Sequence, residues 1–486
     1  MSVEIVGMIA LAIGLIGLVR DPSFIVTAFF CATVFGSAAA FILESLGGLN
    51  ISPSHFLLGF VAVRLFMDRE ISRRIIRGIA PGRPAFWLLL VVMYGVLSAY
   101  FMPRIFAGQT WVFPVRITLN TIKLPLEPIM ANLTQSVYFI SDFFAFALLY
   151  GYGGSPSANK VMGNAALACI VLNLVFVVLD LATYATGTSE LLSFIRNANY
   201  ALMSEAEMFG FKRIVGSFVE ASSFAAATLG YFAFTFRLWL LGVRPTLTMW
   251  LSALSLVALL FSTSATGYVG LCGFLAVSYI QTGVRAMQRP ITPQMLTFMV
   301  GGLFVALLVP VAIALNADAS RYVQDLLDTM LLNKMSTDSG MERAAWNQQA
   351  IENFLDTYGF GAGLGSLRAS SFPIAVLASF GLVGTALFGW FFINLLFSRS
   401  HQSSELTIFE ANRQAAKSTC IAWLITSTVS GALTDLGASF YAFAALACVQ
   451  PFQIAKQVAI PDPQGQRRPV SLLGANLARV LRLRNA

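Results

Sequence analysis

Residues 343–384 read R-A-A-W-N-Q-Q-A-I-E-N-F-L-D-T-Y-G-F-G-A-G-L-G-S-L-R-A-S-S-F-P-I-A-V-L-A-S-F-G-L-V-G. The stretch is polar at first, then rich in glycine, and then apolar from Pro373 onward. Its polar part repeats apolar residues at helical spacing, which predicts an amphipathic helix that ends near Gly359. Its apolar part predicts a helix that enters a membrane, with Gly381 and Gly384 on a small-residue packing face.

The glycines between these two helices occupy alternate positions, at Gly361, Gly363 and Gly365. Glycine accepts a positive φ and lets other groups approach the backbone closely. Two interpretations follow from this: a tight turn between helices, or a loop that lets a ligand approach. A dinucleotide-binding fingerprint is excluded because no strand precedes the glycines and a membrane segment follows them.

The composition indicates an all-α, polytopic membrane protein, because 57% of the 486 residues are hydrophobic and only 11% are charged. One span needs about 20 apolar residues, and the chain offers about 13 such stretches, within a range of about 12 to 14. The predicted spans are residues 3–19, 22–43, 50–67, 85–101, 136–153, 161–181, 222–241, 248–263, 266–281, 295–314, 373–397, 418–434 and 436–452.

The distribution of Lys and Arg predicts the orientation of these spans. Basic residues are about twice as frequent on one side as on the other, which places the N-terminus outside and the C-terminus in the cytoplasm. We expect residues 1–452 to form one transmembrane domain. Its long outside loops are then residues 102–135, 182–221 and 315–372, and residues 453–486 form a basic cytoplasmic tail. An interfacial amphipathic helix is expected after Arg321.

Several classes of function lack support in the sequence. The net charge of +8 follows the positive-inside bias and does not indicate a nucleic-acid partner. All five cysteines fall within predicted spans, and only His55 and His401 are present, so neither a disulfide framework nor a histidine-rich metal site is expected. No metal or nucleotide motif is present, and we expect no metal and no cofactor.

Two aspartates, Asp142 and Asp180, fall within predicted spans. An ionised group inside a membrane costs about 2.5–3.5 kcal/mol on insertion scales, so both side chains should face the bundle interior. We expect them to pair with arginines. We interpret His55, near the start of the third span, as a packing or interfacial residue.

The predicted outside loops carry basic side chains close to the membrane: Lys212, Arg213, Arg321, Arg343 and Arg368. The planar guanidinium group binds phosphate oxygens through two N–H groups and stays charged, so converging arginines can hold a diphosphate. The alternative is that these arginines pair with Glu220, Glu342, Asp325 or lipid headgroups.

Four motifs together resemble the O-antigen polymerase and O-antigen ligase superfamily of bacterial envelope glycosyltransferases. They are R-I-V-G-S-F-V-E-A-S at 213–222, S-x-S-x-T-G at 262–267, R-x-x-W at 343–346, and G-F-G-A-G-L-G at 359–365 before G-L-V-G at 381–384. The resemblance covers residues 213–384 and depends on the order of the motifs and their place among many spans.

The resemblance implies transfer of a glycan from undecaprenyl diphosphate to an acceptor sugar at the periplasmic face of the inner membrane, without metal. It also implies flippase and chain-length-regulating partner proteins. Ligases of this superfamily carry a loop histidine in the pattern H-[N/S/Q]-x9-G-x2-[G/T/Y]. In this chain Ser370 stands at the histidine position, which favours a polysaccharide polymerase over a ligase.

These considerations give a hypothesis for the roles of individual residues. Arg213, Arg321, Arg343, Arg368 and Lys212 would surround the diphosphate and stabilise the leaving group, with Arg343 directly catalytic. Glu220 would be the general base, or else would simply pair with Arg213. Trp346 and Tyr358 would stack on sugars, whereas Gly361, Gly363 and Ser370 would line the acceptor's approach.

Two other classes stay open as alternatives. A lipid-linked oligosaccharide flippase or transporter usually shows two related halves and short loops, and this chain shows neither. A metal-dependent membrane glycosyltransferase would need acidic residues in its first outside loop, but Glu127 is the only acid in residues 102–135.

Overall fold

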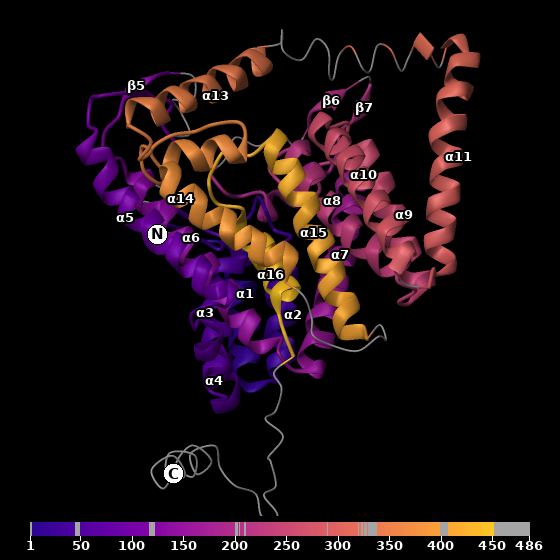
Figure 1. Ribbon diagram of the computed structural model, residues 1–486, viewed down its shortest axis with the longest axis horizontal. Helices are drawn as coiled ribbons and strands as arrows, with labels where there is room; N and C mark the ends of the chain where they lie inside the picture. Colours follow the sequence, from indigo (N-terminus) through magenta and orange to yellow (C-terminus); the bar gives the residue numbers. More distant parts are fainter. Residues whose placement is uncertain are drawn as a thin grey trace, which may run out of the picture. The chain divides into compact units, whose positions relative to one another are not determined.

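The computed structural model describes residues 2–43, 49–115, 122–199, 203, 205–208, 210–288, 290–318, 320–321, 324, 328, 338–398 and 407–451. Residues Met1–Val449 belong to one compact unit, which is built mainly of helices (Figure 1). The predicted cytoplasmic tail lies outside the described residues, and so does most of the predicted amphipathic helix after Arg321.

The helices of the first half are α1 (Ile5–Val19), α2 (Pro22–Ala32), α3 (Pro53–Phe66), α4 (Arg69–Gly78), α5 (Pro84–Ile105), α6 (Met130–Tyr152) and α7 (Pro156–Ala185), followed by the 3₁₀ helix η2 (Ser189–Ile195). Those of the second half are α8 (Ala221–Leu240), α9 (Pro245–Phe261), α10 (Ala265–Gln288), α11 (Pro293–Leu315), α13 (Asp338–Asp356), α14 (Phe372–Phe397), α15 (Ile408–Val429) and α16 (Gly437–Cys448).

Proline and hydroxyl residues fix where many of these helices begin. Proline suits the first turn because its φ is already helical and its missing N–H would have no partner there. At α3, α7 and α11 the proline follows Ser52, Ser155 and Thr292 respectively, and the side-chain oxygen of each accepts a backbone N–H of the first turn.

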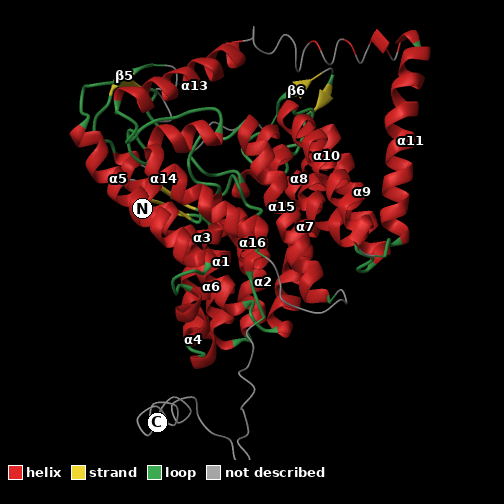
Figure 2. Cartoon of the chain, in the orientation of Figure 1, coloured by secondary structure: helices red, strands yellow, loops and turns green. Residues whose placement is uncertain are grey.

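Short antiparallel strands lie in some of the segments that connect the helices (Figure 2). One sheet has the order β1 (Ser2–Val3), β2 (Phe41–Leu43), β3 (Leu49–Ile51), and two ribbons pair β4 (Trp111–Val112) with β5 (Leu124–Pro125) and β6 (Glu207–Met208) with β7 (Phe211–Lys212). The β4–β5 and β6–β7 ribbons lie in the predicted outside loops, and β2 lies in a predicted span.

Six helices of the described chain are long and apolar enough to cross a membrane: α5, α6, α7, α10, α11 and α14. Further apolar helices are shorter: α1, α2, α3, α9 and α16. The chain is therefore an all-α membrane protein. Within α11 only Met295 is buried, so the rest of that helix presents apolar surface as a lipid-facing helix does.

The predicted span 22–43 is helical only over the 11 residues of α2, which rise about 16 Å against the roughly 30 Å of a bilayer core. After Ala32 the chain turns into a buried irregular segment. There the Ser37 hydroxyl donates to the carbonyls of Ile195 (3.0 Å) and Ser217 (2.9 Å). The apolar residues that follow α2 thus face protein instead of lipid.

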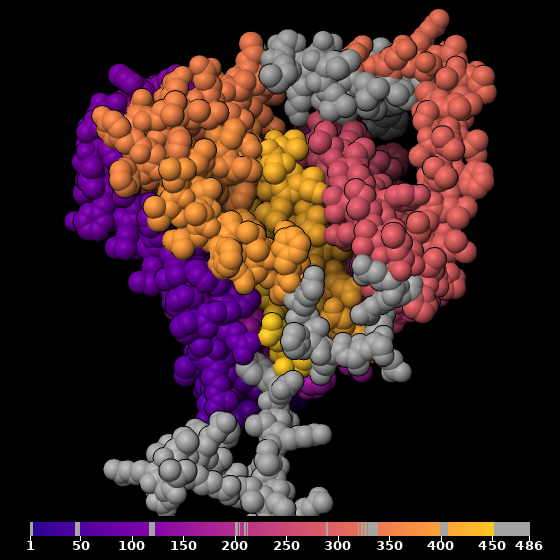
Figure 3. All heavy atoms as spheres, viewed as in Figure 1, coloured from indigo at the N-terminus to yellow at the C-terminus, as the bar shows by residue number. Residues whose placement is uncertain are grey.

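The helices pack in pairs that are often distant in sequence: α8 with α9 and α15, α2 with α7, α6 with α16, and α5 with α14. In the space-filling view α15 lies between α14 and α10 (Figure 3), which it contacts. A Cβ atom at Gly230 of α8 would lie only 2.2 Å from Nε1 of Trp423 in α15, so glycine permits this close approach.

The amphipathic helix predicted from residues 345–354 is confirmed as α13. Trp346, Gln349, Ala350 and Asn353 are buried along one face. Gly359, with φ of 79°, follows the helix end, as expected for a glycine that terminates a helix.

Helix α14 is broken at Gly381, whose φ of 61° and ψ of −163° are not helical. The glycine-rich loop occupies the break. The Ala362 N–H donates to the Ala378 carbonyl (2.8 Å), and the Leu382 N–H donates to the Gly359 carbonyl (2.9 Å). Backbone groups that the kink removes from the helix ladder therefore find partners in the loop, as an apolar interior requires.

The alternate glycines pack against helices at very short range. A Cβ atom at Gly363 would lie 2.5 Å from the Ser98 carbonyl oxygen of α5, and one at Gly365 would lie 2.4 Å from the Ala131 carbonyl oxygen of α6. Gly361 faces the Gly381 nitrogen in the same way. Gly361, Gly363 and Gly365 thus form a tight turn between α13 and α14 and pack closely against the backbone of neighbouring helices.

We predict that Gly381→Ala and Gly363→Ala each destabilise the protein by more than about 1 kcal/mol, because a side chain at positive φ is strained and would also clash with backbone. Thermal unfolding in detergent measures this. Gly389→Ala, in the same helix with open space around its Cα, is the control and should unfold like wild type or slightly higher. Equal midpoints for all three variants would show that the break does not depend on glycine.

Candidate functional site

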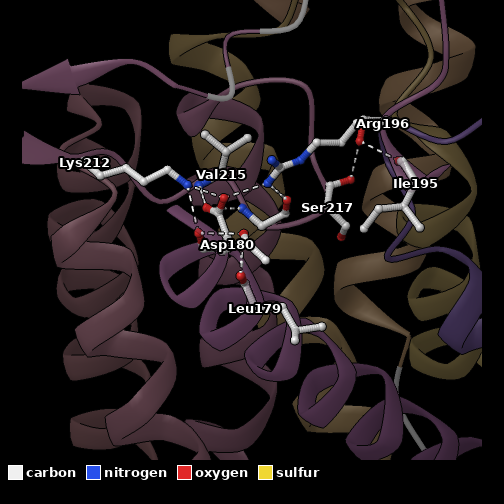
Figure 4. A network of polar contacts seen from close by, with 10 residues as sticks. Leu179, Asp180, Ile195, Arg196, Lys212, Val215 and Ser217 are labelled. Carbon is white, nitrogen blue, oxygen red and sulfur yellow. Dashed lines mark hydrogen bonds and ion pairs between the residues drawn. The ribbon is translucent and has the colours of Figure 1, made fainter. Parts of the chain in front are cut away.

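The carboxylate of Asp180, near the end of α7, is fully buried and holds the segment that follows β6 (Figure 4). Its Oδ2 accepts the N–H groups of Val215 (2.9 Å) and Gly216 (3.0 Å). Its Oδ1 pairs with Arg196 Nη2 (2.7 Å) and with the ammonium group of Lys212. The predicted pairing of Asp180 with an arginine is confirmed, and the backbone around Arg213 is fixed from both sides.

Arg213 extends from this fixed segment to the turn between α9 and α10. Its Nε donates to Thr263 Oγ1 (3.2 Å), and its Nη2 donates to the Thr263 carbonyl (3.2 Å). Thr263 has a φ of 46°, a conformation that non-glycine residues seldom adopt. The first two motifs of the resemblance are thus in direct contact.

Glu220 is the residue immediately before α8, and its backbone is extended. Its Oε1 accepts the hydroxyl of Ser222, and the residue is partly exposed. Burial lowers the pKa of Arg213, while the negative charge of Glu220 raises it. The two side chains therefore lie within electrostatic reach of each other, although no ion pair joins them among the described residues.

Arg368 comes from the loop between α13 and α14. Its guanidinium carbon lies 4.2 Å from the centre of the Trp346 ring, in a cation–π arrangement. Its own N–H donates to the Phe113 carbonyl (2.9 Å), which fixes the backbone. Arg368 Nε is buried and donates to no acceptor among the described residues. One donor of this guanidinium is thus not used by the described part of the protein.

The charges around Arg368 identify its neighbours. Burial lowers the pKa of Arg368, Glu342 and Glu220 raise it, and Arg343 lowers it. Glu342 and Arg343 lie on α13, about one turn from Trp346. Glu220 is distant from them in sequence and immediately precedes α8. We call this group the arginine cluster; its members are Arg213, Glu220, Glu342, Arg343, Trp346 and Arg368.

Ser370 lies beside the cluster but is almost entirely buried, at 7% exposure. Its N–H donates to Asn347 Oδ1 (2.8 Å), and its carbonyl accepts the Gly431 N–H (3.0 Å). Asn347 follows Trp346 directly, and sequence reasoning missed it because an asparagine on a polar helix gives no signal of a loop contact. Both residues position the Arg368 loop.

Three predicted residues lie elsewhere. Lys212 forms a buried ion pair with Asp180, and only 4% of its side chain is exposed. Arg321 is exposed after α11, and no contact of the described residues joins it to the arginine cluster. Tyr358 is 80% exposed, about three helical turns from Trp346, and its ring neighbours Phe106.

Asp142 has a different partner from the one the sequence suggested. The expected arginine is absent among its described neighbours, and His55 Nε2 lies 3.3 Å from its Oδ1. His55 is therefore more than a packing residue. Sequence reasoning missed this pair because the two positions are on separate helices, α3 and α6, whose contact no local pattern reveals.

Comparisons with known proteins give no relative from which a role can be transferred. No family model, no curated protein and no solved structure matches this chain. Among the described residues, no group of three or more His, Cys, Asp or Glu side chains has the arrangement of a metal site. The functional argument therefore depends on the arginine cluster, whose unpartnered guanidinium N–H suits a multiply charged anion.

We predict that Asp180→Asn destabilises the protein by about 3–5 kcal/mol, because it leaves two buried cations without a countercharge. Adding Lys212→Met to this variant should recover part of the loss, since one of the stranded charges is then removed. Unfolding of the single and double variants in detergent measures both effects. Additive losses in the double variant would indicate that Lys212 and Asp180 do not interact energetically.

Proposed function

We propose that this protein is a polysaccharide repeat-unit polymerase of the bacterial inner membrane. It would move a growing glycan from undecaprenyl diphosphate onto a lipid-linked repeat unit. In this proposal the chain crosses the membrane about 13 times, with its N-terminus and the loops that carry the arginine cluster in the periplasm. The observation that supports the proposal most directly is the arginine cluster itself, with Arg368 Nε buried and unpartnered.

The arginines would hold the diphosphate of the donor. Arg213 and Arg368 are both partly buried, and each is fixed by its surroundings, at the Thr263 turn and on the Trp346 ring respectively. Arg343 adds a third positive charge within reach of Arg368. Fixed positive charges stabilise a leaving diphosphate without needing to reorganise.

Glu220 would act as the general base. In the transfer, the bond between the anomeric carbon and the diphosphate oxygen breaks, and its electron pair leaves with the diphosphate. The acceptor hydroxyl oxygen bonds to the anomeric carbon and gives its proton to Glu220. The Ser222 hydroxyl occupies one oxygen of Glu220 and orients the carboxylate, so that the other oxygen is available to the acceptor.

Two alternatives use the same site differently. An O-antigen ligase would transfer the glycan to a lipid acceptor other than a repeat unit, but Ser370, which stands at the ligase histidine position, is buried and held by Asn347. A flippase would bind the same diphosphate lipid and carry it across the membrane without chemistry.

We predict that purified, reconstituted protein converts lipid-linked single repeat units into a ladder of longer products. Glu220→Gln should lower the rate by about 10²–10⁴-fold, as expected for loss of a general base, and Arg343→Ala should also abolish the ladder. Gel analysis of the products measures this. Arg104→Ala is the control, because it also removes an arginine, but one that lies outside the cluster, over the ring of Tyr100; it should polymerise normally.

The same vesicles separate the alternatives. A single transfer to a lipid acceptor without a ladder would indicate a ligase. Movement of the lipid between leaflets with no new product would indicate a flippase and would overturn the enzyme proposal.

We also predict that Arg368→Lys weakens binding of a short-chain isoprenyl diphosphate nearly as much as Arg368→Ala does. Lysine keeps the charge but loses both the planar donor pair and the stacking on Trp346. Calorimetric titration of each variant measures the affinity. Wild-type affinity in Arg368→Lys would mean that only charge matters at this position.

A further inference from the structure

Three ionisable side chains from separate elements meet inside the helix bundle, away from the arginine cluster. They are His55 at the start of α3, Asp142 in the middle of α6, and Asp435 in the segment between α15 and α16. His55 Nε2 lies 3.3 Å from Asp142 Oδ1, and the Asp435 carboxyl lies within electrostatic reach of both groups. None of these contacts serves the function proposed above.

Asp142 has no exposed surface, and no N–H or hydroxyl group of the described residues donates to either of its oxygens in hydrogen-bond geometry. Besides His55, a second carboxyl, that of Asp435, lies within electrostatic reach. Two neighbouring carboxylates at low dielectric repel strongly, and one proton held by the pair removes that repulsion. This arrangement favours a proton on the pair.

The other described polar groups around the two carboxyls do not donate a hydrogen bond to Asp142. The Gly437 N–H donates to Asp435 Oδ1 (3.1 Å), and the Ser52 hydroxyl lies 2.7 Å from His55 Nδ1, which fixes the ring. Tyr441 of α16 is fully buried near both carboxyls, and its hydroxyl has no partner among the described residues. Tyr138 of α6 packs beside His55, and its hydroxyl donates to the Asn50 carbonyl.

We infer that Asp142, Asp435 and His55 form a proton-binding site in which the two carboxyls share one proton beside the imidazole. The side chain of His55 is 17% exposed, and Asp435 is partly exposed, so protons can enter and leave. Metal is not the expected occupant, because the described residues give no cluster with metal-ligand geometry.

The site is joined to the arginine cluster through the backbone. The segment that carries Asp435 also holds the Arg368 loop, because the Gly431 N–H donates to the Ser370 carbonyl and the Ala369 N–H donates to the Ala432 carbonyl (3.3 Å). Loss of the shared proton would set two negative charges against each other and push Asp435 away from α6. The shared proton therefore holds the segment that positions Arg368.

Infrared spectroscopy of the purified full-length protein tests the proposal without any substrate. A protonated carboxyl has a C=O stretching band, separate from the carboxylate bands, that shifts in heavy water. We expect wild type to show this band at neutral pH. Asp142→Asn and Asp435→Asn should each remove it, because a single remaining carboxyl ionises beside His55. Asp356→Asn, which changes an exposed carboxyl bonded to Thr110, is the control and should keep the band.

The outcomes are distinct. Absence of the band in wild type at neutral pH would overturn the proposal. Loss of the band in only one of the two aspartate variants would assign the proton to a single carboxyl and would also overturn it. Weakening of the band by added sodium or potassium at constant pH would mean that a metal cation occupies the site. Because the measurement needs no lipid donor, its result is independent of whether the protein is a polymerase.

Hydrogen exchange of the backbone tests the connection to Arg368. In wild type, exchange at Ala369 and Gly431, corrected for the intrinsic pH dependence, should accelerate as alkaline pH removes the proton. In Asp435→Asn, whose neutral amide can donate to Asp142 at any pH, this acceleration should disappear. Equal pH dependence in both proteins would show that the carboxyl pair does not hold this segment.

Discussion

The buried carboxylate of Asp180 holds the segment that leads from β7 to α8. It is buried at the end of a long apolar helix, where an unpaired charge would be costly, and it is neutralised by two cations and two backbone N–H groups at once. The segment before α8 has little regular structure of its own, so these contacts determine where Arg213 and Glu220 stand. Neutralisation of this buried charge therefore also determines the positions of Arg213 and Glu220.

Backbone hydrogen bonding is the second constraint. The break in α14 frees groups that water cannot reach, and the glycine loop supplies their partners. The same loop places Arg368 against the ring of Trp346. The segment that provides hydrogen-bond partners for the broken helix therefore also positions this cation. The Asp435 segment contributes further bonds to that loop, which brings a third region of the chain to the same place.

Much of the fold could be predicted from the sequence because hydrophobic stretches and helical spacing are local signals. Helix α13, the membrane helices and the glycine turn are of this kind. The failures are non-local. Residues 33–43 are as apolar as a span, but they are covered by protein, which hydropathy cannot distinguish from lipid. Lys212 and Arg213 are adjacent basic residues and look equivalent in the sequence. In the fold, Lys212 pairs with Asp180, whereas Arg213 binds the turn at Thr263. The pairing of His55 with Asp142, across two helices, left no periodic pattern at all.

The junction between the glycine loop and the broken helix α14 tolerates many changes in the surrounding sequence. It is made almost entirely from peptide groups and from the missing side chains of glycine, so it places few demands on the chemistry of the residues around it. Side chains such as Ala362 and Leu364 fill space, and other apolar residues of similar volume can do the same. Two proteins could keep this junction in full and share little more than the spacing of their glycines.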